Sequence, residues 1–436
     1  MNQKKDQTDM ICGTTEAGFE SVKQLFTEQM KTLAEENTQL CVYHQGKKVI
    51  DLWASKNQDP NFNADSLINV FSSSKSLEAI ALASLVTKGL LRYDAKLCDY
   101  WPEFKGGGKD DVSVADLMRH EAGLANFDTS IDLDDLLPQG IRANCVGKTI
   151  EQQTQHFRSP ATGKREYHAV TRGWIANEIF RRVDPQGRTI GEYLKEDVST
   201  PLDADVVIGL DDSELERTSD VKLLSFGAHI RASFRPKIFG RRVLHNFLQL
   251  AARMLKILPS LRNGSSSKAP APITGMTDVG IFNDKRLRKG ETPSANAHGS
   301  ARGFARIAAM MAAGGNLDGE EYLSPNAWQS MHQNPMPAKM GGVIHTRFTQ
   351  GGVDQFLPVE KDSPLLEKAF NDGREGFYGW MGLGGSIFQW HPEAQIGFAF
   401  VPSSLHMLDF LNERGKLYQA EVLRCIDQLP KSQTLT

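Results

Sequence analysis

The spacing of apolar residues changes along the chain from a helical period to an alternating one and back. Residues 15–35 place an apolar side chain at every third or fourth position, which is the period of an amphipathic helix. Two apolar runs, 40–44 and 49–53, then flank Gln45-Gly46-Lys47 and predict a β-hairpin. After a run of serines, a largely apolar segment that ends at Gly89 predicts a buried helix.

From about residue 100 to residue 290 the pattern is mostly helical, with long irregular connections. Three stretches carry the helical period there: 114–119, 172–182 and 241–258. Strand signals return near the end of the chain. The elements expected in that part are a helix at 300–313, strands at 385–390 and 396–401 with a turn between them, and a closing helix at about 406–428.

This order of elements predicts an α+β fold in which the two ends of the chain build one antiparallel sheet flanked by helices. We expect a disordered N-terminal extension at 1–12 and an α/β domain formed by 13–100 together with 295–430. The mainly helical region 101–294 would be inserted between these two parts. A cleft is expected where the inserted region meets the sheet, and pockets tend to lie at such junctions.

Composition limits the class of protein further. The chain has 436 residues, of which 40% are hydrophobic and 24% charged, with a formal net charge of −3, so nothing global points to nucleic acid. No apolar run approaches the ~18–20 residues of a membrane span, and the N-terminus lacks the apolar core of a secretory signal. Five scattered cysteines without a CxxC pair indicate reduced thiols. We therefore expect a cytoplasmic protein.

The candidate chemistry starts at the head of the buried helix, where Ser72 and Lys75 stand three residues apart. This spacing puts the hydroxyl and the amine on one face, one helical turn apart. A lysine taken partly out of water has its charged form disfavoured, so it can act as a base at neutral pH. Ser72 is therefore the candidate nucleophile and Lys75 its activator. The alternative is an ordinary helix start with serine caps and a surface lysine.

The Ser-x-x-Lys pattern by itself is not specific. It occurs again at Ser219–Lys222, in a polar stretch without a buried helix behind it, and at Ser265–Lys268, in a segment with the composition of a linker. Only the copy at Ser72 precedes a long apolar segment.

Two further stretches carry candidate chemistry. Tyr167 lies just before a predicted helix, and a phenol near two cations would have a depressed pKa and could pass a proton between nucleophile and leaving group. The glycine-dense stretch 378–386 lies where a strand begins, so its backbone N–H groups could serve as an oxyanion hole. The alternatives are a tyrosine that anchors a loop, and a β-bulge or tight turn needed for packing.

In this order the three segments resemble the serine β-lactamase and penicillin-binding-protein superfamily, whose signature set begins with Ser-x-x-Lys. The likeness is closer to the class C-like branch, which contains family VIII esterases and animal β-lactamase-domain proteins. It runs from about residue 13 to residue 428. The stretches that carry it are 18–20, 51–53, 69–72, 116–124, 167–174, 300–304 and 382–387.

The resemblance implies a β-lactamase/transpeptidase-like fold and a role for each matching residue. Ser72 would be the acyl-accepting nucleophile, with Lys75 and Tyr167 sharing the acid–base work. Trp380-Met381-Gly382 would occupy the Lys-Thr-Gly position, on an edge strand. The oxyanion hole would then use the backbone N–H groups of Ser72 and Leu383.

Two positions depart from the family pattern. Ala169 stands where the motif has an asparagine that helps to hold the lysine, and Trp380 stands where the last motif has a cation. Penicillins and D-Ala-D-Ala peptides carry a carboxylate that pairs with this cation, and a lost charge-assisted bond costs about 1.5–3 kcal/mol. We therefore expect ester hydrolysis, with amide or β-lactam cleavage less favoured. No metal or other cofactor is required, and His120 and His168 are expected to have loop or capping roles.

The segment 222–268 is basic. Between Asp220 and Asp278 it contains ten lysines and arginines and no acidic residue. Its helical part carries a broad apolar face, so 231–258 could lie on an anionic membrane surface. The alternative is a helix whose apolar side covers the active-site cleft or packs in the core.

A non-enzymatic function is also open. Members of the superfamily serve as scaffolds or self-assembling proteins, and the loss of the motif asparagine is compatible with such a role. The joint presence of Ser72, Lys75 and Tyr167 favours the enzyme, because a scaffold needs none of them. The substrate and the oligomeric state are left open by the sequence.

Overall fold

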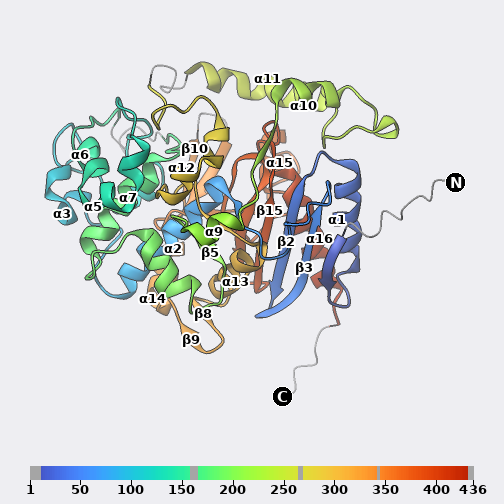
Figure 1. The fold of residues 1–436 in the computed structure, drawn as a ribbon, viewed down its shortest axis with the longest axis horizontal. Coiled ribbons are helices and arrows are strands. Elements are labelled where there is room, and N and C mark those ends of the chain that lie inside the picture. The colour runs from blue at the N-terminus through green and yellow to red at the C-terminus, as the bar shows by residue number, and fades with distance from the viewer. Residues whose placement is uncertain (1–10, 158–164, 264–268, 341–343, 431–436) are drawn as a thin grey trace.

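Figure 1 shows a sheet layered with helices and, beside it, a second part that is mostly helical. The computed structural model describes residues 11–157, 165–263, 269–340 and 344–430, and within 256–263 only the course of a helix. No described helix has both the length and the apolar character needed to cross a lipid bilayer.

The sheet has nine antiparallel strands. In spatial order they are β1 (Ile11–Thr15), β3 (Lys47–Ser55), β2 (Asn37–His44), β15 (Ile396–Pro402), β14 (Ile387–His391), β13 (Tyr378–Met381), β12 (Asp354–Gln355), β11 (Ile344–Phe348) and β10 (Met336–Met340). The two ends of the chain meet where β2 pairs with β15, with Leu40 opposite Phe400. The predicted α+β fold, with one antiparallel sheet built from both ends, is confirmed.

The hairpin β2–β3 shows how local sequence sets this sheet. Gln45 and Gly46 both have positive φ, 52° and 75°, as a two-residue type I′ turn requires. Strand β1 was not predicted from the sequence: Ile11 pairs with Ala54 and Cys12 with Trp53 on β3. The predicted disorder of 1–12 is therefore wrong for these two residues, and 1–10 lie outside the described part.

Helices cover both faces of the sheet. α1 (Glu20–Thr32) and α16 (Glu413–Gln428) pack together on one face, where the ring of Tyr418 lies 5.1 Å from that of Phe400. α13 (Ala301–Ala312) packs on β15 and β2. Gly397 permits this approach, because a Cβ there would lie 2.3 Å from the backbone nitrogen of Ala309. The closing helix starts at Glu413 and not at 406, because 404–406 form strand β16 (Ser404–His406) and 407–412 form an irregular turn.

The second part of the molecule packs around α2 (Lys75–Thr87), which is buried over nearly its whole length. Its other helices are α3 (Leu97–Tyr100), α4 (Val114–Met118), α5 (Pro138–Arg142), α6 (Cys145–Glu151), α7 (Thr171–Val183), α8 (Ile190–Tyr193), α9 (Asp212–Glu216), α12 (Lys285–Lys289) and α14 (Pro325–His332). α15 (Leu365–Asn371) lies on β11. The short strands are β4 (Ile68–Asn69), β5 (Val206–Val207), β6 (Lys222–Leu224), β7 (His298–Gly299), β8 (Asn316–Leu317) and β9 (Glu320–Glu321). The region 101–294 is thus mainly helical, and its status as a separate domain stays a prediction.

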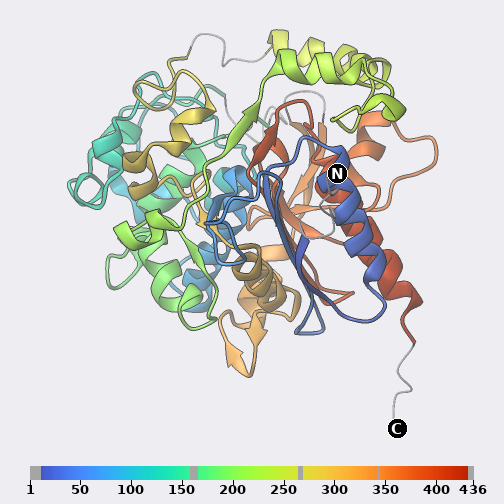
Figure 2. The same cartoon turned by 45° about the vertical axis from the view of Figure 1, so that its right-hand side comes forward.

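The basic segment forms two helices, α10 (Phe226–Ser233) and α11 (Phe247–Asn263), which lie across the top of the molecule in Figures 1 and 2. The helix expected at 241–258 begins only at Phe247. Asn246 caps it: its Oδ1 accepts the N–H of Gln249 at 2.9 Å, and its own N–H donates to Oε1 of Gln249 at 3.0 Å. This reciprocal capping box ends the irregular stretch before α11.

Candidate active site

Ser72 lies in a single 3-10 turn (Phe71–Ser74) that leads into α2. The preceding Phe71 has φ 46°, which costs a non-glycine residue about 1–3 kcal/mol. Asn69 holds this strained turn, because its Oδ1 accepts the N–H of Phe71 at 2.6 Å. The turn leaves Ser72 partly exposed, whereas the three residues that follow it are buried.

Lys75 is fully buried behind Ser72. Its Nζ donates to the carbonyl oxygen of Ala169 at 2.6 Å and to that of Ser294 at 3.0 Å, and it lies 3.4 Å from Ser72 Oγ. Burial holds the pKa of Lys75 well below its ordinary 10.5, and the charge of Arg172 lowers it further while Glu78 opposes the shift.

These contacts give the amine a definite orientation. In its neutral form the amine has two hydrogens and one lone pair, and the two carbonyls are placed to accept both hydrogens. The lone pair is then left for the Ser72 hydroxyl. The backbone of Ala169 thus holds Lys75 even though this position lacks the motif asparagine.

A buried ion pair supports the amine from behind. Arg172 on α7 donates to Glu78 at 2.8 Å and to the carbonyl of Lys75 at 2.9 Å, and both charged side chains are fully buried. Gly173 allows α7 to approach closely, because a Cβ there would lie 2.4 Å from the nitrogen of Ser294. The pair was not expected from the sequence, although Glu78 is the one acidic residue in the largely apolar helix α2.

Tyr167 reaches the same place from the loop before α7. Its hydroxyl accepts the indole N–H of Trp380 at 3.0 Å, and Lys75 Nζ lies 4.9 Å from the ring centroid. The predicted depressed pKa is wrong, because burial raises the pKa of Tyr167 to about 12, although hydrogen bonds to Ser72 and Trp380 oppose the shift. Lys75 has a depressed pKa, and the charge of Arg172 is paired with Glu78. Neither side chain therefore lowers the pKa of Tyr167 enough to outweigh the effect of its burial. Tyr167 is therefore a neutral phenol beside the nucleophile.

The glycine-rich stretch follows β13 and faces Ser72. The N–H of Gly382 donates to the Ser386 carbonyl at 2.9 Å, so it is not available to a substrate. In the described part of the chain, the N–H groups of Ser72 and Leu383 have no backbone acceptor. Asn412, which the sequence did not single out, holds this turn by donating to the Gly382 carbonyl at 2.7 Å.

The strand that carries Trp380 is not an edge strand, which corrects the expectation. β13 pairs with β14 along its length and with β12 at Tyr378 and Gly379, and β11 and β10 extend the sheet beyond it. Only its end at Trp380 and Met381 lacks a second described neighbouring strand. There the N–H of Trp380 donates to Ser76 Oγ at 3.2 Å, which ties the strand to α2.

A cavity of about 160 Å³ lies beside Ser72, Tyr167 and the glycine-rich stretch. Its lining residues are Ser72, Tyr167, Ile344, Phe370, Trp380, Met381, Gly382, Leu383, Gly384, Met407, Asp409, Phe410 and Asn412. The described lining contains no lysine, arginine or histidine and includes one acidic residue, Asp409. The cavity thus offers no positive charge to a substrate carboxylate.

The histidines near the motifs hold loops together, as expected. His120 Nδ1 accepts the N–H of His168 at 3.0 Å, and His168 Nε2 accepts the N–H of Leu124 at 3.1 Å. Burial lowers the pKa of His168 to about 3, so its ring is neutral. The second Ser-x-x-Lys copy is not a site of this kind, because Lys222 is exposed and pairs with Glu36. The third copy, at 265–268, lies outside the described residues.

The comparisons with known proteins agree with this arrangement. A model of the beta-lactamase family matches residues 22–421. The chain belongs to the beta-lactamase family. It is 27% identical over 410 residues to the esterase/beta-lactamase LipL of Mycobacterium tuberculosis, covering 91% of this chain and 83% of that one.

Solved structures of the family show the same fold. A penicillin-binding protein homologue from Caulobacter crescentus and a family VIII carboxylesterase are each 26% identical to this chain, with a TM-score of 0.71. Each match covers 95% of this chain and 99% of the solved one. The predicted β-lactamase-like fold and the resemblance to family VIII esterases are therefore confirmed.

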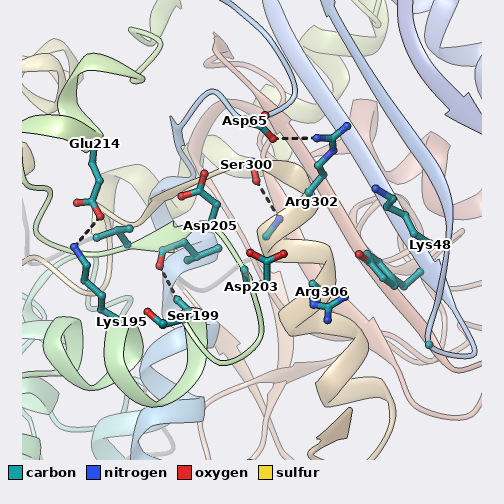
Figure 3. Close-up of a pocket in the computed structure, with 17 residues that line it drawn as sticks. Lys48, Asp65, Lys195, Ser199, Asp203, Asp205, Glu214, Ser300, Arg302 and Arg306 are labelled. Atoms are coloured by element: carbon teal, nitrogen blue, oxygen red, sulfur yellow. Dashed lines mark hydrogen bonds and ion pairs between the residues drawn. The ribbon is translucent and has the colours of Figure 1, made fainter. Parts of the chain in front are cut away.

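A larger cavity of about 820 Å³ lies away from Ser72, between the hairpin, α9 and α13 (Figure 3). Its lining includes eight charged residues, four of which pair with one another: Arg302 with Asp65 at 3.0 Å, and Lys195 with Glu214 at 2.8 Å. The cavity does not include Ser72, Lys75 or Tyr167. Its charges are consistent with a solvated, ion-paired surface recess.

Proposed function

We propose that this member of the beta-lactamase family is a serine hydrolase that cleaves carboxylic esters through an acyl-Ser72 intermediate. The observation that carries the proposal is the buried amine of Lys75, whose Nζ is bound to the carbonyls of Ala169 and Ser294 and lies 3.4 Å from Ser72 Oγ. An activated hydroxyl next to a base is the arrangement that nucleophilic catalysis requires. The relatives named esterase and carboxylesterase support ester cleavage.

In the first half-reaction, Ser72 Oγ forms a bond to the ester carbonyl carbon as Lys75 takes its proton. The carbonyl oxygen becomes an oxyanion, which the N–H groups of Ser72 and Leu383 bind. The intermediate collapses when the bond to the alcohol oxygen breaks. Tyr167 donates its phenolic proton to that oxygen, and the Lys75 ammonium restores the proton to Tyr167. A neutral phenol suits this role better than a phenolate.

The second half-reaction repeats these steps with water. Lys75 accepts a proton from the attacking water while the oxyanion hole binds the second tetrahedral intermediate. Ser72 Oγ leaves and recovers its proton from the amine, and the carboxylic acid is released. The enzyme returns to its starting state, so no proton is gained or lost by the protein.

The cavity supports a neutral ester over a β-lactam or a peptide with a free carboxylate. The described lining has no cation to pair with such a carboxylate, and its one acidic residue, Asp409, is already paired with Arg414 at 3.2 Å. The volume of about 160 Å³ is below the usual range of small-molecule sites, so it suits a short acyl or alcohol group packed against Trp380 and Phe410. We propose a small or partly inserted ester as the substrate, acting in a reducing, cytoplasmic environment.

Labelling with a fluorophosphonate probe and a panel of p-nitrophenyl esters test the proposal. Wild-type protein should be labelled and hydrolyse short-chain esters, and Ser72→Ala should abolish both. Ser219→Ala is a matched control, because Ser219 begins the second Ser-x-x-Lys copy, which lacks the buried amine. A wild type without labelling and without turnover would overturn the hydrolase and favour a scaffold.

A further inference from the structure

Large apolar side chains are exposed in one place far more than elsewhere. Of the eleven that are exposed in the described part of the chain, seven lie within residues 223–255, which we call the basic ridge. They are Leu223, Phe226, Phe234, Ile238, Phe239, Leu248 and Leu255. Ile238 is 85% exposed and Leu248 77%. Large apolar side chains that gather on the exposed surface of one segment mark an interaction site.

The ridge also carries positive charges that no described acidic side chain compensates. Arg231, Arg235, Lys237 and Arg242 are exposed, and no described acidic side chain forms an ion pair with them. No acidic residue occurs between Asp220 and Asp278. Exposed cations mixed with exposed aromatic and aliphatic side chains are the two requirements of a surface that lies on an anionic bilayer.

The ridge is fixed to the rim of the catalytic cavity. His245 and Arg253 both bind the carboxylate of Glu413, at 2.7 and 2.8 Å, and β6 pairs in parallel with β16. Between β16 and Glu413 lie four residues that line the cavity beside Ser72: Met407, Asp409, Phe410 and Asn412. Phe410 is itself 42% exposed. A membrane bound to the ridge would therefore lie near the cavity entrance.

Core packing does not account for the whole apolar face. Val243 and Leu250 are buried at 1% exposure and attach the ridge to the protein, whereas the seven large apolar residues named above stay exposed. A second copy of the chain does not fit well either. A two-fold interface would place the same surface on both partners, and here it would oppose cations to cations. An anionic lipid surface complements both the charge and the apolar side chains.

We propose that the basic ridge docks the protein on anionic lipid bilayers, with the entrance of the Ser72 cavity close to the lipid headgroups. The docking is a property of the surface and does not depend on the chemistry of Ser72. It would give the enzyme access to esters that partition into membranes, with the acyl or alcohol end in the cavity. This last step rests on the proposed function.

Vesicle co-sedimentation of the full chain, in the Ser72→Ala background, tests docking without catalysis. Protein with an unchanged ridge should bind vesicles that contain phosphatidylcholine and phosphatidylglycerol. It should not bind vesicles of phosphatidylcholine alone. Arg231→Gln, Arg235→Gln and Lys237→Gln together should weaken binding by about fivefold per charge, on the order of 10²-fold in all. The matched control removes three exposed lysines elsewhere, with Lys105→Gln, Lys148→Gln and Lys285→Gln, and should bind within about twofold of the wild-type ridge.

The apolar contribution is tested separately. Ile238→Ser with Phe239→Ser should weaken vesicle binding by about tenfold or more, whereas the equally drastic Met336→Ser with Leu365→Ser should not. If the Ile238 and Phe239 variant binds vesicles as tightly as protein with an unchanged ridge, lipid docking is overturned and a soluble polyanion is favoured as the partner of the ridge. If the triple ridge variant and the triple lysine control lose vesicle binding equally, binding does not depend on the basic ridge and the proposal is overturned.

Turnover of a short soluble ester, measured with Ser72 intact, separates the two proposals. The ridge variants should keep the wild-type kcat/KM on this ester, which also shows that they fold. Their activity should fall only on an ester embedded in anionic vesicles. If wild-type protein binds vesicles but hydrolyses no ester, the proposed function fails and the docking surface stands. If it hydrolyses esters but does not bind vesicles, the docking surface fails and the proposed function stands.

Discussion

Replacement of Lys75 by methionine tests the neutral amine on which the mechanism depends. The change keeps the length of the side chain and removes the base. General-base catalysis contributes about 10²–10⁴-fold, so kcat/KM should fall by that factor. The same change should alter how stability depends on pH, which activity alone does not report.

The sign of the pH effect follows from the depressed pKa. Between the pKa of Lys75 in the folded protein and the ordinary 10.5, the amine is neutral when folded but protonated when unfolded. The unfolded state therefore binds one more proton, so this group makes stability rise with pH by about 1.4 kcal/mol per pH unit in that window. Lys75→Met removes this slope. Above 10.5 the amine is neutral in both states, and the slope vanishes.

Urea denaturation of wild type and Lys75→Met at a series of pH values between neutrality and 10 measures the difference. The stability of wild type relative to the variant should rise steadily with pH. Lys416→Met is a matched control, because Lys416 is also buried with its pKa lowered to about 8, but it bonds to Ala369 away from Ser72. The pH dependence of its stability should differ from that of wild type only above about pH 8, and it should keep its activity. Parallel curves for wild type and Lys75→Met would show a charged Lys75 and refute the mechanism.

Three further substitutions test the surroundings of the amine. Trp380→Lys should raise kcat/KM for a carboxylate-bearing ester relative to a neutral one by about 10–100-fold, and an unchanged ratio would count against the charge argument. Glu78→Gln leaves buried Arg172 uncompensated and should lower the free energy of unfolding by about 3–5 kcal/mol in urea. Gly173→Ala should lower activity more than tenfold by displacing the backbone that binds the amine, whereas Gly227→Ala, with nothing within 4 Å, should retain full activity.

Several elements were predictable because their causes are local. The hairpin turn at Gln45-Gly46 and the buried helix after Ser72 depend on residues next to one another, and both were predicted. The spacing of Ser72 and Lys75 fixes their shared face in the same way. The start of α11 was missed although its signal is local: Asn246 and Gln249 have the spacing of a capping box.

The family could be predicted from the sequence because its motifs are short and ordered along the chain. The pKa of each catalytic group and the position of each strand in the sheet could not. The pKa of Tyr167 is raised and not depressed, because burial outweighs the neighbouring cations. Likewise β13 lies inside the sheet, because residues 336–355 add three strands beyond it. Neither fact can be read from the residues around Tyr167 or Trp380.

By itself the sequence determined which chemical groups the site can contain: an alcohol, an amine and a phenol in the order of a known family. Tertiary structure alone decided what they can do. The carbonyls that orient Lys75 come from Ala169 and Ser294, 94 and 219 residues away, and the packing that leaves Lys75 with no exposed surface removes the water that would keep the amine charged. Desolvation and long-range hydrogen bonds depend on the packed fold, so they have no signature in local sequence.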